Sequence, residues 1–114
     1  MNNADFVARL KYRTAEQGGR SVPAHSGYRP TIKFQFDSMY TSGEQKFHGR
    51  SFVHPGQEVI ADIRIVSVIY FAGRLSKGDN FIFTEGQTII GSGEIVEIIN
   101  PILIKKPAAN TAYT

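Results

Sequence analysis

Apolar and polar residues alternate along several short stretches of the chain. Every second residue from Phe6 to Tyr12 is apolar, whereas Arg9 and Lys11 fall on the other side. The stretch 58–66 has the same period of two, with Asp62 opposite its apolar positions. A period of two is typical of a strand with one face in the core and one in water. Both stretches are therefore predicted to be β-strands.

Four further strands are expected, two between these stretches and two after them. They are predicted at 32–36, at 45–52, around Phe81 and Phe83, and at 89–99, where Gly91 and Gly93 indicate a bulge or a close approach of two backbones. Residues 41–43 and 73–79 have turn composition, and the run 66–71 is apolar on both faces. The segment 14–30 contains three glycines and two prolines and is predicted to be a long loop.

Six short strands joined by glycine and proline turns, with no helical pattern, predict an all-β antiparallel barrel or sandwich. The chain has 114 residues, of which 41% are apolar, so it has room for one core. We expect a single domain over residues 1–100 and a flexible C-terminal tail over 101–114.

The charge is unevenly distributed, which affects the choice of partner. The net charge is +3, and residues 1–33 alone carry six Lys and Arg against two Asp and Glu, which gives +4. Such a basic segment is compatible with binding to phosphate, and equally with a solvated strand face. The chain has no Cys, and neither a secretory signal nor a membrane-spanning apolar run is apparent. We expect a cytoplasmic protein that binds neither a membrane nor DNA.

No pattern in the sequence predicts catalysis. Gly86 and Gly91 have the spacing of a phosphate-binding loop, but the Lys that this motif requires is missing. The three histidines have no metal-ligand spacing, so a zinc site would need ligands that converge from different strands. Phe34 and Phe36 have the spacing of a base-stacking pair, although alternation favours a place in the core. We therefore expect no catalytic residue, no metal and no cofactor, and hold an unrecognised hydrolase only as a remote alternative.

The long loop contains the most specific motif of the chain. Residues 18–30 read G-G-R-x-x-P-x-x-x-G-Y-R-P. Its glycines permit positive φ and its prolines restrict φ, which predicts a rigid connection. Tyr28 and Arg29 then offer an amphipathic ring and a forked cation to a partner.

This motif resembles the first long loop of the C-terminal, third β-barrel domain of elongation factor Tu. The similarity continues through Phe34, through Pro55 and Gly56, and through the glycines of the last strand, and so covers residues 5–99. The resemblance implies a six-stranded antiparallel closed barrel. In that family the barrel helps to hold the T-stem of aminoacyl-tRNA and packs against the GTPase domain, close to the loop in question.

The resemblance also implies two sets of site residues. Arg20, Tyr28 and Arg29 match the partner-binding loop, whereas Thr31, Glu85 and Gly86 match the RNA-facing positions. Thr31 stands where the family usually has Gln, residues 87–89 lack the family's Arg, and the loop 70–79 is longer. These departures fall mainly on the RNA side.

The sequence thus predicts a noncatalytic binding module related to translation. Its expected partner is either a protein, such as a GTPase domain or another translation component, or tRNA. The alternative is a mimic of elongation factor Tu that acts as an immunity or regulatory protein. Because fold does not determine function, both expectations depend on analogy.

Overall fold

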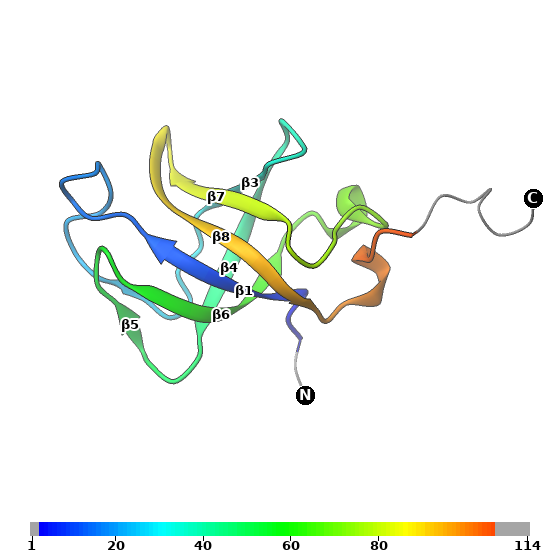
Figure 1. Ribbon diagram of the computed structural model, residues 1–114, viewed down its shortest axis with the longest axis horizontal. Coiled ribbons are helices and arrows are strands. Elements are labelled where there is room, and N and C mark those ends of the chain that lie inside the picture. Colours follow the sequence, from blue (N-terminus) through cyan, green and yellow to red (C-terminus); the bar gives the residue numbers. More distant parts are fainter. Residues whose placement is uncertain (1–2, 107–114) are drawn as a thin grey trace, which may run out of the picture.

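The computed structural model describes residues 3–106 and shows an all-β fold built on a closed antiparallel barrel (Figure 1). Six strands close the barrel in the order β1, β6, β4, β3, β7, β8. Their bounds are β1 Phe6–Tyr12, β3 Thr31–Phe34, β4 Tyr40–Phe47, β6 Glu58–Ile65, β7 Asn80–Glu85 and β8 Thr88–Ile98. Two short strands, β2 Ala24–His25 and β5 Phe52–Val53, pair with each other outside the barrel. The predicted six-stranded closed barrel is confirmed.

The alternating pattern correctly predicts which side chains fill the barrel. In β1 the side chains of Phe6, Ala8, Leu10 and Tyr12 are buried, whereas Arg9 is exposed. The strand pairs with β6 on one side and β8 on the other, so its backbone groups are bonded along both edges. Closure of the sheet in this way leaves no free strand edge in the barrel.

Close contacts with a neighbouring backbone at Gly91 and with an aromatic ring at Gly93 explain the two glycines of β8. A Cβ on Gly93 would lie 2.3 Å from Cζ of Phe81, and one on Gly91 would lie 2.4 Å from the backbone oxygen of Lys11. The aromatic rings of the core need this space, since Phe81 also packs edge-on against Phe6 at 5.8 Å between ring centroids. The predicted close approach is therefore confirmed.

The turn predicted at 41–43 is wrong, because these residues lie inside β4. Gly43 is present for space: a Cβ there would lie 2.2 Å from Cδ1 of the buried Ile32. The weak strand predicted at 45–52 is correspondingly shifted, since β4 ends at Phe47 and β5 begins only at Phe52. A glycine that makes room for a neighbour has the same sequence signature as a glycine in a turn.

The strand predicted at 32–36 is shorter than expected, because β3 ends at Phe34. Phe34 is buried, as predicted, but Phe36 is 44% exposed and stacks on the Phe34 ring at 5.5 Å between centroids. Only one of the two rings therefore belongs to the core.

Two turns of 3-10 helix close one end of the barrel. The first, η1 Val68–Phe71, replaces part of the apolar run, and it buries Phe71. The second, η2 Pro101–Leu103, buries Leu103. After η2, the N–H of Lys105 donates to the oxygen of Leu75 at 2.8 Å. Ordered packing thus extends past the boundary expected at residue 100. The remaining part of the predicted tail, 107–114, lies outside the described residues.

Candidate functional site

The long loop 14–30 is fixed to the barrel by backbone hydrogen bonds. Its strand β2 pairs with β5, so that His25 lies opposite Phe52. Farther on, the N–H of Gly27 donates to the oxygen of Gln45 at 2.7 Å, and the N–H of Gln45 donates to the oxygen of Tyr28 at 2.8 Å. These hydrogen bonds hold the backbone of the loop against β5 and β4 up to the start of β3.

A carboxylate at the end of β7 holds the side chains of this loop. The Tyr28 hydroxyl and the Arg20 guanidinium both donate to Oε2 of Glu85. Arg20 also donates to the backbone oxygens of Val22 at 3.2 Å and Pro23 at 3.3 Å, and its Cζ lies 5.0 Å from the centroid of the Tyr28 ring. We call Arg20, Tyr28 and Glu85 the loop clasp.

The charges of the loop clasp stabilise its hydrogen bonds. Partial burial and the adjacent Glu85 carboxylate raise the pKa of Tyr28, so its hydroxyl stays neutral and donates. Partial burial alone would raise the pKa of Glu85, but hydrogen bonds from Tyr28 and Arg20 outweigh this effect and lower it. Glu85 is therefore ionised at neutral pH and accepts both bonds.

A buried polar pair supports the clasp from inside the barrel. The Tyr12 hydroxyl donates to Oε1 of Gln45, and both side chains are almost completely buried. The Tyr12 and Tyr28 rings lie 6.4 Å apart between centroids, and burial is the main reason that the pKa of Tyr12 is raised. Because Gln45 also pairs with the loop backbone, the core and the loop are directly connected.

The structure brings together three of the six predicted site residues. Arg20 and Tyr28, predicted to contact a protein, contact Glu85, which was predicted to face RNA. Gly86 follows in the β7–β8 turn with φ of 59°, and Thr31 lies on the neighbouring strand β3. Arg29 points elsewhere and lies 3.4 Å from the Glu44 carboxylate.

The joined loops expose side chains that the sequence reasoning did not select. Val22 and Phe52 are 55% and 41% exposed, and His25 and His54 flank the Phe52 ring at 6.0 and 5.2 Å between centroids. We call Val22, His25, Phe52 and His54 the loop surface. The composition of 14–30 indicated the loop, but no local signal indicates that residues 52–54 pack beside it.

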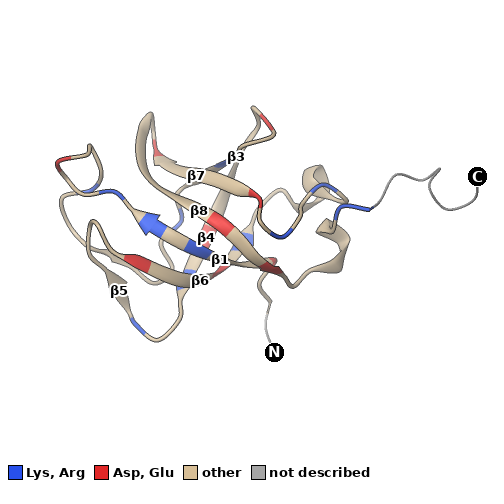
Figure 2. Cartoon of the chain, in the orientation of Figure 1, with Lys and Arg blue, Asp and Glu red and all other residues tan. Residues whose placement is uncertain are grey.

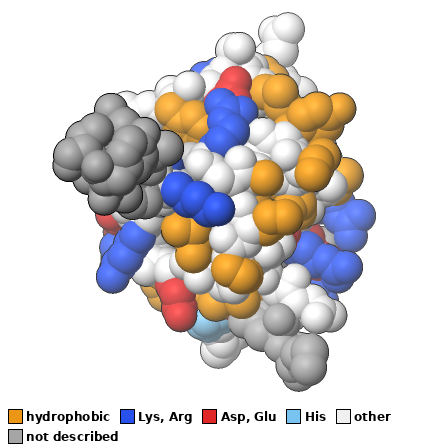
Figure 3. Space-filling model, turned by 90° about the vertical axis from the view of Figure 1, so that its right-hand side faces the viewer, with side chains coloured by type: hydrophobic (Ala, Val, Ile, Leu, Met, Phe, Trp, Pro, Cys, Tyr) orange, Lys and Arg blue, Asp and Glu red, His pale blue; other side chains and the backbone are white. Residues whose placement is uncertain are grey.

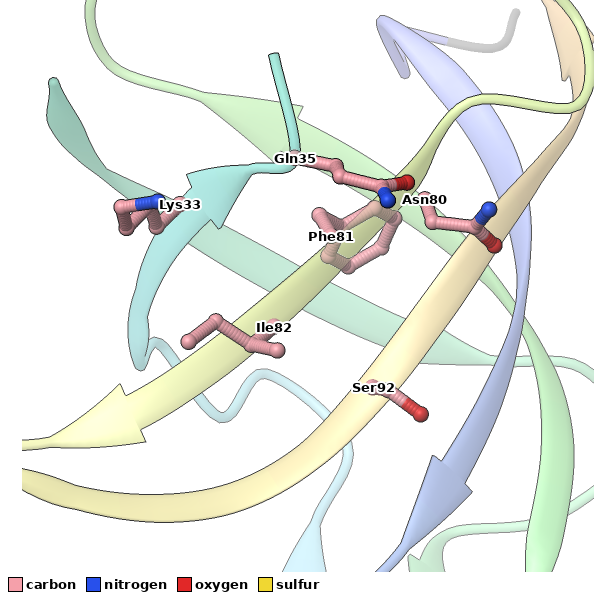
Figure 4. Close-up of a pocket in the computed structure, with 6 residues that line it drawn as sticks. All are labelled: Lys33, Gln35, Asn80, Phe81, Ile82 and Ser92. Carbon is pink, nitrogen blue, oxygen red and sulfur yellow. The ribbon is translucent and has the colours of Figure 1, made fainter. Parts of the chain in front are cut away.

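A shallow groove of about 470 Å³, lined by both polar and apolar side chains, runs over the outer face of β3, β7 and β8 (Figure 4). Figure 4 shows the amides of Gln35 and Asn80 at one end and Ser92 farther along β8. Lys33 supplies an ammonium, but no carboxylate and no histidine line the groove. These groups can donate and accept hydrogen bonds, but they offer no acid–base pair for catalysis.

The cations of the basic N-terminal third are largely paired within the barrel. Each of four of them contacts a carboxylate on another part of the sheet or loop: Arg9 with Glu94, Lys11 with Glu58, Arg20 with Glu85, and Arg29 with Glu44. Figure 2 shows positive and negative residues interspersed across the strands. This third of the chain therefore forms no continuous cationic surface within the described residues.

No protein-family model matches the sequence.

Across residues 3–106, no three His, Cys, Asp or Glu side chains gather where they could hold a metal ion. The same range contains no helix that is long and apolar enough to span a membrane.

Proposed function

We propose that this chain is a noncatalytic binding module that contacts a protein partner through the loop surface. The observation that carries the proposal is the loop clasp, which holds a long loop in one conformation beside exposed apolar side chains. A preformed surface loses little conformational entropy when it binds. In this proposal Arg20 and Tyr28 position the loop, and Val22 and Phe52 contact the partner.

The chemistry available on the barrel supports a noncatalytic role. The carboxylate of Glu85 is occupied by two donors, and the polar groups of the groove over β3, β7 and β8 are amides, a hydroxyl and one ammonium. A general acid or base needs a free titratable group within reach of a substrate.

The resemblance to elongation factor Tu suggests the class of partner. The matched motif covers Gly18–Pro30, and in that family the corresponding loop lies near the GTPase domain. A translation component, such as a separately encoded GTPase domain, is therefore the proposed partner. The mimic hypothesis uses the same surface and differs only in that the chain would compete with elongation factor Tu for that partner.

Transfer RNA is the main competing partner, and internal pairing of the basic residues argues against it. RNA binding depends on cations that are free to displace counterions from phosphates. Four of the six cations in residues 1–33 instead pair with carboxylates.

Two binding measurements test the proposal. Purified protein should retain a specific protein from a lysate of its own cells, and the double variant Val22→Asp/Phe52→Asp should lose it. Asn80→Asp/Ser92→Asp is the matched control, because it adds the same two charges at exposed positions of β7 and β8 outside the loop surface. Tight binding to labelled total tRNA that weakens steeply with salt, without a retained protein, would overturn the protein-binding proposal.

A further inference from the structure

Exposed apolar side chains gather at the end of the barrel opposite the loop surface (Figures 1 and 3). Ile69 and Tyr70 of η1 are 73% and 61% exposed, and Ile102 and Ile104 are 52% and 44% exposed. Together with Phe36, which is 44% exposed, these residues are called the apolar end. Figure 3 shows hydrophobic side chains spread over this face with Lys and Arg among them.

Arg74 and its neighbours join these side chains into one surface. The Arg74 guanidinium lies 5.3 Å from the centroid of the Phe36 ring and donates to the oxygen of Tyr70 at 3.2 Å. The preceding residue, Gly73, donates its N–H to the oxygen of Ile102 at 2.8 Å. The apolar end is therefore contiguous although it comes from three separate segments.

Buried side chains behind the apolar end hold it in place. Phe71, Leu75 and Leu103 are fully buried, and Phe71 and Leu103 directly follow the exposed Tyr70 and Ile102 in sequence. Leu75 pairs with Ile104 and donates its N–H to Leu103 at 2.8 Å. Soluble proteins rarely expose large contiguous apolar patches unless they bind something. A firmly supported patch of this kind is a candidate docking surface.

The charge around the apolar end is positive. Residues 66–78 and 99–106, which build most of it, contain Arg74, Lys77, Lys105 and Lys106 and no Asp or Glu. All four side chains are exposed. Asp37 neutralises Arg74 at 2.7 Å, but among residues 3–106 no carboxylate forms an ion pair with any of the three lysines.

We propose that the apolar end binds a protein segment in which apolar side chains are flanked by Asp or Glu. Its apolar residues would cover Ile69 and Ile102, while its carboxylates would face the lysines. A second copy of the chain fits poorly, because a symmetric contact would place the same cations opposite one another. An anionic membrane fits less well too, since three free lysines are fewer than the clusters of about 4–8 cations that typically recognise such surfaces.

A library of displayed random peptides tests the proposal with the purified protein. We expect selection to enrich peptides that combine Leu, Ile or Phe with Asp or Glu. The best peptide, made synthetically and labelled, should bind on the order of tenfold more weakly to Lys105→Glu/Lys106→Glu and to Ile69→Asp. Lys46→Glu/Arg50→Glu is the charge-matched control, and it should leave the affinity unchanged because both residues are exposed away from the apolar end.

Several outcomes would overturn this proposal without affecting the loop surface. They are a lack of enrichment, enrichment without acidic residues, and equal weakening by the control variant. Binding to vesicles of phosphatidylserine and phosphatidylcholine that competes with the peptide would instead assign the surface to membranes. Self-association in sedimentation that Ile69→Asp abolishes would assign it to a second copy. Circular dichroism of each variant establishes that a lost interaction is not lost folding.

Discussion

Removal of the Glu85 carboxylate should release the long loop. In Glu85→Ala, both Tyr28 and Arg20 lose their common acceptor. A hydrogen bond to a charged group contributes about 1.5–3 kcal/mol, and exposure reduces that contribution. The Glu85 side chain is 43% exposed. We therefore expect a loss of about 2 kcal/mol for the two bonds together, which corresponds to a decrease in Tm of about 8 °C for a domain of this size.

Chemical denaturation and amide hydrogen exchange measure this effect. Unfolding in urea gives the free-energy difference, and exchange should accelerate at the N–H groups of Gly27 and Tyr28, which bond within the loop and to β4. Glu58→Ala is the matched control, because the Lys11–Glu58 pair is exposed on both sides and should contribute only about 0–1 kcal/mol. If Glu85→Ala costs no more than Glu58→Ala, the loop clasp does not hold the loop.

The difference in the free energy of unfolding between the wild type and Glu85→Ala should become smaller at acidic pH. The two hydrogen bonds keep the pKa of Glu85 in the folded protein below its usual value of 4.5. Stability from this ionised carboxylate is therefore complete above the pKa of the unfolded chain, and is lost as the pH falls through the lower folded pKa. The free-energy gap between the wild type and Glu85→Ala should shrink on acidification. A gap that is constant from neutral to strongly acidic pH would contradict this explanation.

Two further substitutions test the packing of the barrel. Gly93→Ala should cost about 1–3 kcal/mol, because its Cβ would lie 2.3 Å from the Phe81 ring, whereas Ser92→Ala on the exposed side should change stability by less than about 0.5 kcal/mol. Leu103→Ala should cost about 2–5 kcal/mol in urea denaturation, since Leu103 is fully buried, and the exposed Ile102→Ala should cost far less. Equal costs within either pair would show that the inner and outer positions are assigned incorrectly.

Alternation of apolar and polar residues was sufficient to predict most of the barrel. Side chains on a strand point alternately to opposite faces, so the pattern from Phe6 to Tyr12 indicates both the strand and its buried face. The turn predicted at 41–43 shows where this reasoning fails. Position 43 of β4 is a glycine because a side chain there would collide with Ile32 on another strand. That contact cannot be recognised from the local sequence.

Local composition also identified the long loop, because glycine permits and proline restricts backbone conformations that are incompatible with regular structure. Only the tertiary structure decided what the residues of this loop contact. Glu85 is 57 positions from Tyr28, and Phe52 is 27 positions from His25, which are contacts that depend on strand pairing. The apolar end has the same origin, since it joins Phe36, η1 and η2 across one end of the barrel. A chain specifies local conformation through each residue's own backbone preferences, but a surface exists only after distant segments have packed together.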